Sequence, residues 1–249
     1  MTAAPPVIRE RGPTRSLSAG WWIAAGLALI PALIPPVSLL VQVLGGNSDV
    51  VLPASRLLQL FINTLLLTVA VTVTAVGIGT TTAWFTMRTN IPFRRVWMIL
   101  AAIPLVIPSY VAALSIIGAT GADGLIHALT GWTVATPYGF VGAWLALSVF
   151  LAPMAHLIIA PGLSLIDPAT EEAAIGLGSS RIRSFFTITI PQLRPAIVSA
   201  GLMVGLYTIS DFGAVSLLRY DTFTRAIFTL YQGQIDRGPA QTLSAILMV

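Results

Sequence analysis

The sequence contains no cysteine, no lysine and only two histidines. Without cysteine, the chain has no disulfide, no thiol nucleophile and no thiolate metal site. Without lysine, it has neither the P-loop lysine that contacts nucleotide phosphates nor an amine for Schiff-base chemistry. The two histidines, His127 and His156, do not form the HExxH zinc motif. These absences exclude P-loop ATP hydrolysis, thiol catalysis and HExxH-type zinc hydrolysis.

Charged residues are scarce, because they make up only 9% of the 249 residues, whereas about 25% is usual in soluble domains. Hydrophobic residues make up 56%, and the mean hydropathy is +0.88. A single globular core could not bury so much apolar surface, and the few polar side chains could not cover it. The composition therefore predicts an all-α integral membrane protein, a bundle of several spans.

Several stretches are long enough to cross a membrane, which takes about 20 mostly apolar residues. Four of them lack Asp, Glu and Arg: residues 21–44, 61–87, 96–117 and 140–163. A fifth, over residues 196–218, includes Asp211, and a sixth begins near Ala240 and is incomplete at Val249. Ten helical residues rise about 15 Å, half of the hydrocarbon thickness. We therefore expect six spans, the last of them incomplete here, so that either the chain is a fragment or its last helix is completed elsewhere.

The arginines lie mostly on one side of the expected spans. Nine are on the side of the N-terminus: Arg9, Arg11, Arg15, Arg88, Arg94, Arg95, Arg181, Arg183 and Arg194. The other side has four: Arg56, Arg219, Arg225 and Arg237. Because positive residues accumulate on the cytoplasmic side, the N-terminal arm (1–19) and the connection over residues 164–195 are predicted to be cytoplasmic. The first apolar stretch is too long for a typical signal peptide, so we expect it to be retained.

The most polar cytoplasmic segment, residues 167–195, has the pattern of a short helix. Asp167 is a favourable N-cap and Pro168 suits the first helical position. Glu171 and Glu172 lie near the positive end of the helix dipole, and Gly178 permits a break. A stripe of mostly small apolar side chains runs along one face: Ala169, Ala173 and Leu177. Such a face suits either close approach by another protein or contact with lipid headgroups, and the pattern alone favours neither. A second short helix is expected over residues 181–186, with Pro191 and Pro195 marking re-entry into the membrane.

Part of this segment resembles the cytoplasmic EAA motif of permease subunits in binding-protein-dependent ABC importers. The motif positions, at the expected intervals, are Glu172, Ala173, Ala174, Gly178, Ile188 and Pro191, with Ile190 in place of leucine. The resemblance implies the fold of a type I ABC importer permease, with a transmembrane domain over residues 20–249. It also implies that the segment is a coupling helix that docks on separate ATPase subunits. Glu171 is included among its coupling residues, and no enzymatic activity and no cofactor are expected of the chain itself.

Other segments are similar to ferric-iron-type permeases. They are Asn63-Thr64, the Ile103-Pro104…Ile107-Pro108-Ser109-Tyr110 run, and the segment from Asp211-Phe212-Gly213 to Ile227. In that family one chain often carries two homologous halves, so the resemblance implies the first half of such a permease in a prokaryotic plasma membrane. An extracytoplasmic binding protein and a second permease half would be its partners. Permeases for thiamine, sulfate, polyamines and phosphonates are similar too, so the resemblance does not decide the substrate.

A few residues are candidates for the transport pathway or its gate. Asp211 is the only acid in an expected span, and such residues usually face a bundle interior or a wet cavity. Phe212, Pro104 and Pro108 are further candidates, since the prolines interrupt a span. An Asp211 that reaches headgroup water and a purely structural proline kink are the alternatives. For His156 we expect a packing role.

Two other classes of function, an ion-gradient-driven transporter and an intramembrane enzyme, remain open. The transporter would need a relay of ionisable groups within the membrane, and the enzyme would need His156 and Asp211 to act together. The sequence supports neither relay nor motif, because these two residues lie in different expected spans. Nucleic-acid binding is not favoured despite a pI near 10.1, because the charges form no basic stripe.

Overall fold

The computed structural model describes Val37, residues 53–89 and 92–233, and four isolated helical positions near the C-terminus (Ala240, Leu243, Ser244 and Leu247). The expected N-terminal arm, nearly all of the first span and most of the sixth lie outside these residues. The described segments contain helices and loops. Three helical segments are long and apolar enough to cross a membrane: Ala54–Arg88, Phe140–Ser164 and Arg181–Ser210.

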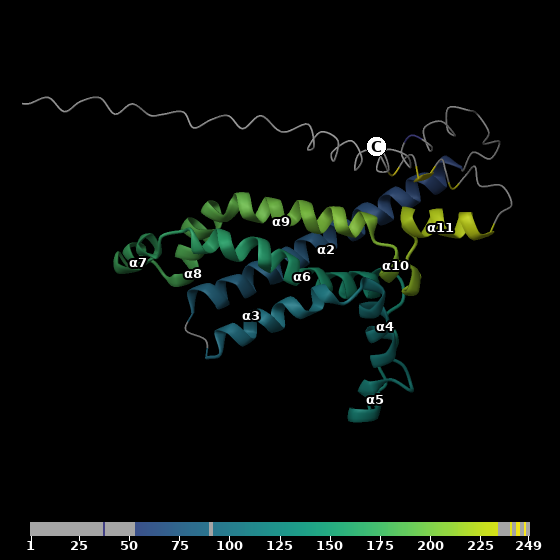
Figure 1. Cartoon of the computed structure of the whole chain (residues 1–249), viewed down its shortest axis with the longest axis horizontal. Helices are drawn as coiled ribbons and strands as arrows, with labels where there is room; N and C mark the ends of the chain where they lie inside the picture. Colours follow the sequence, from purple (N-terminus) through teal and green to yellow (C-terminus); the bar gives the residue numbers. More distant parts are fainter. Residues whose placement is uncertain are drawn as a thin grey trace, which may run out of the picture.

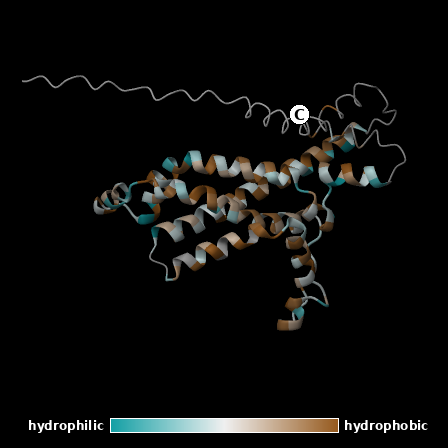
Figure 2. Cartoon of the chain, in the orientation of Figure 1, coloured by the Kyte–Doolittle hydropathy of each residue, from teal (hydrophilic) through white to brown (hydrophobic). Residues whose placement is uncertain are grey.

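These three segments lie side by side in one bundle (Figure 1). They are α2 (Ala54–Arg88), α6 (Phe140–Ser164), and the continuous run of α8 (Arg181–Ser184), η2 (Phe185–Thr189) and α9 (Ile190–Ser210). Of the most apolar window in each segment, 67% is buried for α6 and 22% for each of the other two. The apolar, Ala-rich α6 is therefore the central helix, packed between α2 and α9. Hydrophobic residues extend along the bundle, including its outer surface (Figure 2), as expected of helices in lipid.

Small residues bring the helix backbones into contact. A Cβ atom added to Gly79 of α2 would lie 2.6 Å from Ala155 Cβ and 2.8 Å from the backbone nitrogen of His156 in α6. On α9, Gly201 and Gly205 face Thr72 of α2, at 3.6 and 3.5 Å from such added atoms. This is the close approach by which small residues pack membrane helices, where lipid supplies no hydrophobic drive between helices.

The span expected over residues 96–117 is not one helix, and its interruption at the prolines is larger than the expected kink. The chain instead forms α3 (Arg94–Ala102), the 3₁₀ turn η1 (Ile103–Val106) and α4 (Ser109–Ala119). Figure 1 shows α3 running along the bundle and α4 turning away from it, with the short α5 (Leu125–Thr130) at its tip. Pro108, in extended conformation, precedes α4. Proline has no N–H to continue a helix and disfavours helical backbone at the residue before it.

The fifth expected span is shifted towards the N-terminus. Its helical run begins at Arg181 and ends at Ser210. The short helix expected over residues 181–186 therefore begins where predicted, as α8, but continues through η2 into α9. Asp211 is extended and lies outside the helix rather than inside a span. The short helix α10 (Gly213–Leu217) follows, and then α11 (Phe223–Gly233). Pro191 is the second residue of α9 and lies directly after the π-helical turn, inside the continuous helical run.

Candidate functional site

The polar segment forms helix α7 (Pro168–Gly176) as the sequence predicts. Asp167 caps it, because its Oδ1 accepts a hydrogen bond of 2.9 Å from the backbone N–H of Ala169. Two residues after the helix, Gly178 adopts the left-handed conformation, with a φ of +92°. The closing bonds of the helix run from the N–H of Gly178 to the carbonyl of Ile175 and from Ser179 to Ala174. A residue with a side chain is strained at this φ, which explains glycine there.

Helix α7 lies at one end of the bundle and presents an open surface (Figure 1). None of its nine described residues is buried. Glu172 and the small side chains of Ala169 and Ala173 are exposed, and Leu177, directly after the helix, is 90% exposed. Of the remaining motif positions, Ala174, Ile188 and Pro191 are half-buried, while Gly178 is exposed.

Glu171 and Glu172, the two neighbouring acids of α7, lie in different surroundings. Glu172 is exposed, whereas the Glu171 side chain is only 17% exposed. Glu171 accepts a hydrogen bond from the hydroxyl of Thr189, which is fully buried. Its Oε1 also lies 3.8 Å from Nε of Arg88, the last residue of α2. The pairing with Arg88 was not predicted, because the position of Arg88 in the sequence indicated only a positive charge near the membrane.

Arg88 also contacts the end of α6. Its Nη2 donates hydrogen bonds to the carbonyl oxygens of Leu163, at 3.3 Å, and of Ile166, at 2.8 Å. These carbonyls belong to the C-terminal turn of α6 and the residues after it, where a helix leaves acceptors unpaired and favours a positive charge. Arg88 lines a polar pocket of about 370 Å³, together with Glu171, Glu172 and Arg181.

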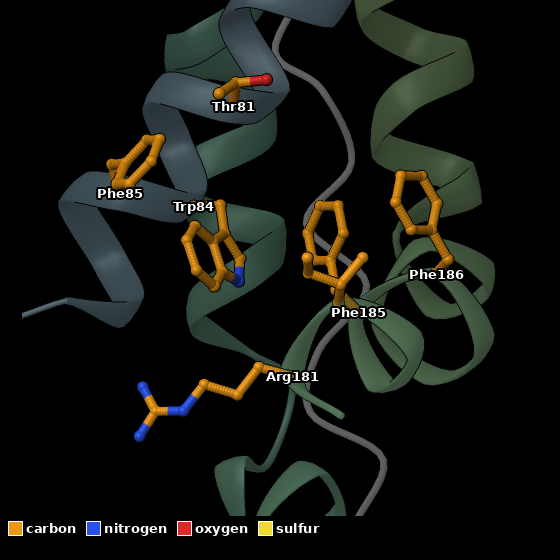
Figure 3. Close-up of a pocket in the computed structure, with 7 residues that line it drawn as sticks. Thr81, Trp84, Phe85, Arg181, Phe185 and Phe186 are labelled. Atoms are coloured by element: carbon orange, nitrogen blue, oxygen red, sulfur yellow. The ribbon is translucent and has the colours of Figure 1, made fainter. Parts of the chain in front are cut away.

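Next to this polar pocket lies an apolar groove of about 220 Å³, which separates α2 from the segment leading into α9. Trp84 and Phe185 face each other across it, with ring centroids 5.6 Å apart, and Phe85 and Phe186 flank them (Figure 3). Phe185 begins the π-helical turn η2, which the N–H of Ile190 closes on the carbonyl of Phe185. The turn positions Ile188 and buried Thr189 at the base of α7.

The opposite end of the bundle contains Asp211, which is 6% exposed. Its carboxylate accepts hydrogen bonds from the backbone N–H of Ala214, at 3.0 Å, and from the Ser109 side chain. The adjacent Gly213 packs tightly on α4, since an added Cβ would lie 2.9 Å from Ser109 Oγ. Asp211 therefore joins the turn between α9 and α10 to the first residue of α4, directly after Pro108.

The other gate candidates have different neighbours. Phe212 packs against Phe228 of α11, with ring centroids 4.4 Å apart. Pro104 lies in η1, four residues before Pro108. The structure thus brings Asp211 close to Pro108, whereas Phe212 faces α11 and Pro104 belongs to the preceding turn.

Asn63 and Thr64 hold the segment before α11 against α2. Asn63 Nδ2 donates to the backbone carbonyl of Asp221, at 2.9 Å, and the Tyr220 hydroxyl donates to the carbonyl of Asn63, at 3.2 Å. The Thr64 hydroxyl accepts from the N–H of Phe223, at 3.2 Å. The Asp221 carboxylate pairs with two arginines, one on α2 and one on α11: Arg56 and Arg225. Asn63 and Thr64 therefore fix the turn before α11 against α2.

His156 is 3% exposed, and its Nδ1 lies 3.1 Å from the hydroxyl of Thr82 on α2, consistent with the expected packing role. It is far from Asp211, because the start of α6 lies beside α10 and His156 is about 24 Å further along the helix. The structure therefore does not bring the two residues of the hypothetical enzyme together. Within the described residues, no group of three or more His, Asp or Glu side chains could hold a metal ion.

Comparison with known proteins gives several matches. The chain is 35% identical over 193 residues to the Fe(3+)-transport system permease protein FbpB 2 of Haemophilus influenzae, covering 78% of this chain and 35% of that protein. It is 26% identical over 177 residues to the sulfate transport system permease protein CysT of Escherichia coli, covering 68% of this chain and 64% of that protein. The chain spans about a third of the length of the ferric-type relatives.

Among solved structures, a bacterial ABC transporter involved in the import of the acidic polysaccharide alginate has a similar fold. The TM-score is 0.63 at 16% identity, and the match covers 91% of each chain. This likeness confirms the expected all-α membrane fold of an ABC importer permease. The sequence model described as "Binding-protein-dependent transport system inner membrane component" matches residues 75–249. The chain therefore belongs to the family of inner-membrane components of binding-protein-dependent transport systems.

Proposed function

We propose that this chain forms half of the translocation pathway of an ATP-driven importer and that its cargo is ferric iron. The exposed, motif-bearing helix α7 at one end of the bundle carries the proposal. The iron-transport function named for the relative that is 35% identical supports the choice of cargo. Sulfate or another small solute is the second candidate, supported by the match to a sulfate permease.

The chain's own residues would couple the pathway to separate ATPase subunits. Glu172 would face the ATPase, and Ala173 and Ala174 would allow close approach of its surface. Gly178 would form the turn that ends the docking helix, with Ile188 and Pro191 at its base. Closure of the ATPase subunits on nucleotide would then displace α7 and swing the spans between inward- and outward-facing arrangements.

The proposal includes orientation and partners. In it the α7 end, with the connection over residues 164–195, faces the cytoplasm, and so does the N-terminus. Arg88, Arg181 and Arg183 at the α7 end support this orientation by the positive-inside rule. The opposite end, with Asp211, Phe212, Pro104 and Pro108 as gate residues, receives cargo from an extracytoplasmic binding protein. A second permease half, in the same chain or in a partner subunit, completes the translocation pathway in the bilayer.

Transport into vesicles tests the proposal. The complete permease is reconstituted with its ATPase subunits and binding protein, and ⁵⁵Fe³⁺ uptake is measured with and without internal ATP. We expect uptake that requires ATP and persists when proton and sodium gradients are collapsed. Uptake driven by either gradient without ATP would refute the importer, and uptake of sulfate in place of iron would refute only the cargo.

The docking role of α7 has its own test. Glu172→Lys and Gly178→Trp should abolish most uptake, while the variants still insert and purify as folded protein. The matched control is Gly176→Ala, since a Cβ there meets no atom of the described residues within 4 Å. If the ATPase subunits co-purify equally with all three variants and uptake persists, α7 is not the docking helix.

A further inference from the structure

Helix α7 must be held to the bundle if its displacement is to move the spans, yet it has little packing of its own. None of its nine described residues is buried. Its most protected polar side chain is that of Glu171, which points back towards the bundle rather than towards solvent. The connection between α7 and the spans therefore depends strongly on the partners of this carboxylate.

The partners of Glu171 connect it to all three membrane-length segments. Arg88 is the last residue of α2, and its guanidinium also holds the carbonyls of Leu163 and Ile166 at the end of α6. Thr189 is the last residue of the π-helical turn that continues into α9. Three side chains thus tie the ends of α2, α6 and α9 to one point on α7.

The surroundings strengthen this charged contact. The Arg88 side chain is 13% exposed and that of Glu171 is 17% exposed, so water and salt screen the pair less than they screen an exposed pair. Loss of one partner leaves the other charge poorly solvated and uncompensated. Arg88 Nη2 donates to the carbonyls of Leu163 and Ile166, while its Nε, 3.8 Å from the Glu171 carboxylate, forms an ion pair with it but no hydrogen bond.

We propose that Arg88 and Glu171 form a charged link that transmits displacement of α7 to the ends of α2, α6 and α9. Arg88 is thus a positioning residue for coupling, and Glu171 acts within this chain while its neighbour Glu172 serves the docking surface. The proposal rests on the proposed function for its transport consequence. Its structural content, a fixed placement of α7 relative to α2, is independent of any partner.

A double-mutant cycle tests the transport consequence. In the reconstituted importer, Arg88→Gln and Glu171→Gln should each lower cargo transported per ATP hydrolysed by about tenfold. A tenfold loss corresponds to an interaction energy within the range that double-mutant cycles give for contacting residues. The double variant should be no worse than the more severe single variant. The control is Arg194→Gln, an exposed arginine on α9, which should stay within about twofold of wild type. A double variant whose loss equals the product of the single losses overturns the link.

A distance measurement tests the link without partners. The chain has no cysteine, so spin labels can be placed at Val73→Cys on α2 and Leu177→Cys beside α7, which are 68% and 90% exposed. Pulsed electron spin resonance should give a narrow distance distribution that broadens in Glu171→Gln and stays unchanged in Glu172→Gln. An unchanged distribution in Glu171→Gln overturns the link. If wild-type uptake needs no ATP, the proposed function fails, but this measurement still decides whether the link exists.

Discussion

Replacing Gly79 by alanine tests how closely α2 and α6 pack at the centre of the bundle. The new Cβ would lie 2.6 Å from Ala155 Cβ and 2.8 Å from the backbone nitrogen of His156, whereas carbon atoms pack best at about 3.5–4.0 Å. An overlap of about 1 Å with backbone and Cβ atoms has no rotamer that relieves it, so the two helices must separate. Overpacking of this kind costs about 1–3 kcal/mol, and we expect the upper half of that range.

Gly77, two residues earlier on the same helix, is the matched control. A Cβ added there meets no atom of the described residues within 4 Å. Alanine is favoured over glycine in a helix by up to about 1 kcal/mol, so Gly77→Ala should be neutral or slightly stabilising. The two variants add the same methyl group to the same helix, so the propensity gain cancels and they should differ by the overpacking cost, about 2–3 kcal/mol in stability.

The assay is unfolding of the purified protein in mild detergent, by an SDS titration and by thermal melting followed through tryptophan fluorescence. Gly79→Ala should unfold at lower SDS fraction and lower temperature than wild type, and Gly77→Ala should not. Equal stability of the two variants would refute the described contact between α2 and α6.

Three further substitutions follow from the described contacts. Asp211→Ala should destabilise the protein by about 1–3 kcal/mol in the same melts, because it leaves the buried N–H of Ala214 without its acceptor; unchanged melting would contradict this. Asp221→Asn should cost less than about 1 kcal/mol, and less still at high salt, because the Asp221 side chain is 38% exposed and its ion pairs are screened by solvent. His156→Gln should keep uptake within about twofold and preserve the contact with Thr82, whereas abolished uptake by a folded variant would indicate a direct role in transport.

The long helices and α7 could be predicted because their signals are local. An apolar run of 25 residues forms α6 within a residue of its expected bounds, since length and composition decide whether a segment can span lipid. Asp167 and Pro168 predict the start of α7 because capping depends on residues within one turn.

The parts that could not be predicted depend on contacts between distant residues or on competing local preferences. Arg88 and Glu171 are 83 residues apart, and no sequence period relates them. Asp211 was placed inside a span because the apolar run continues past it, but its carboxylate caps the next short helix instead. The prolines at 104 and 108 indicated a kink, whereas hydropathy could not reveal that α4 would turn away from α3 and pack on α6 and α10.

The π-helical turn Phe185–Thr189 sets the angular relation between α8 and α9. Each residue of an α-helix turns the chain by about 100°, so deleting one residue of α8 would rotate η2 and α9 by that angle. The hydroxyl of Thr189 would then face away from Glu171, and the lipid-facing and core-facing sides of α9 would change places over part of its circumference. The number of residues between Gly178 and Ile188 therefore sets the rotation of α9 about its axis. Insertions or deletions in this interval are less tolerable than substitutions.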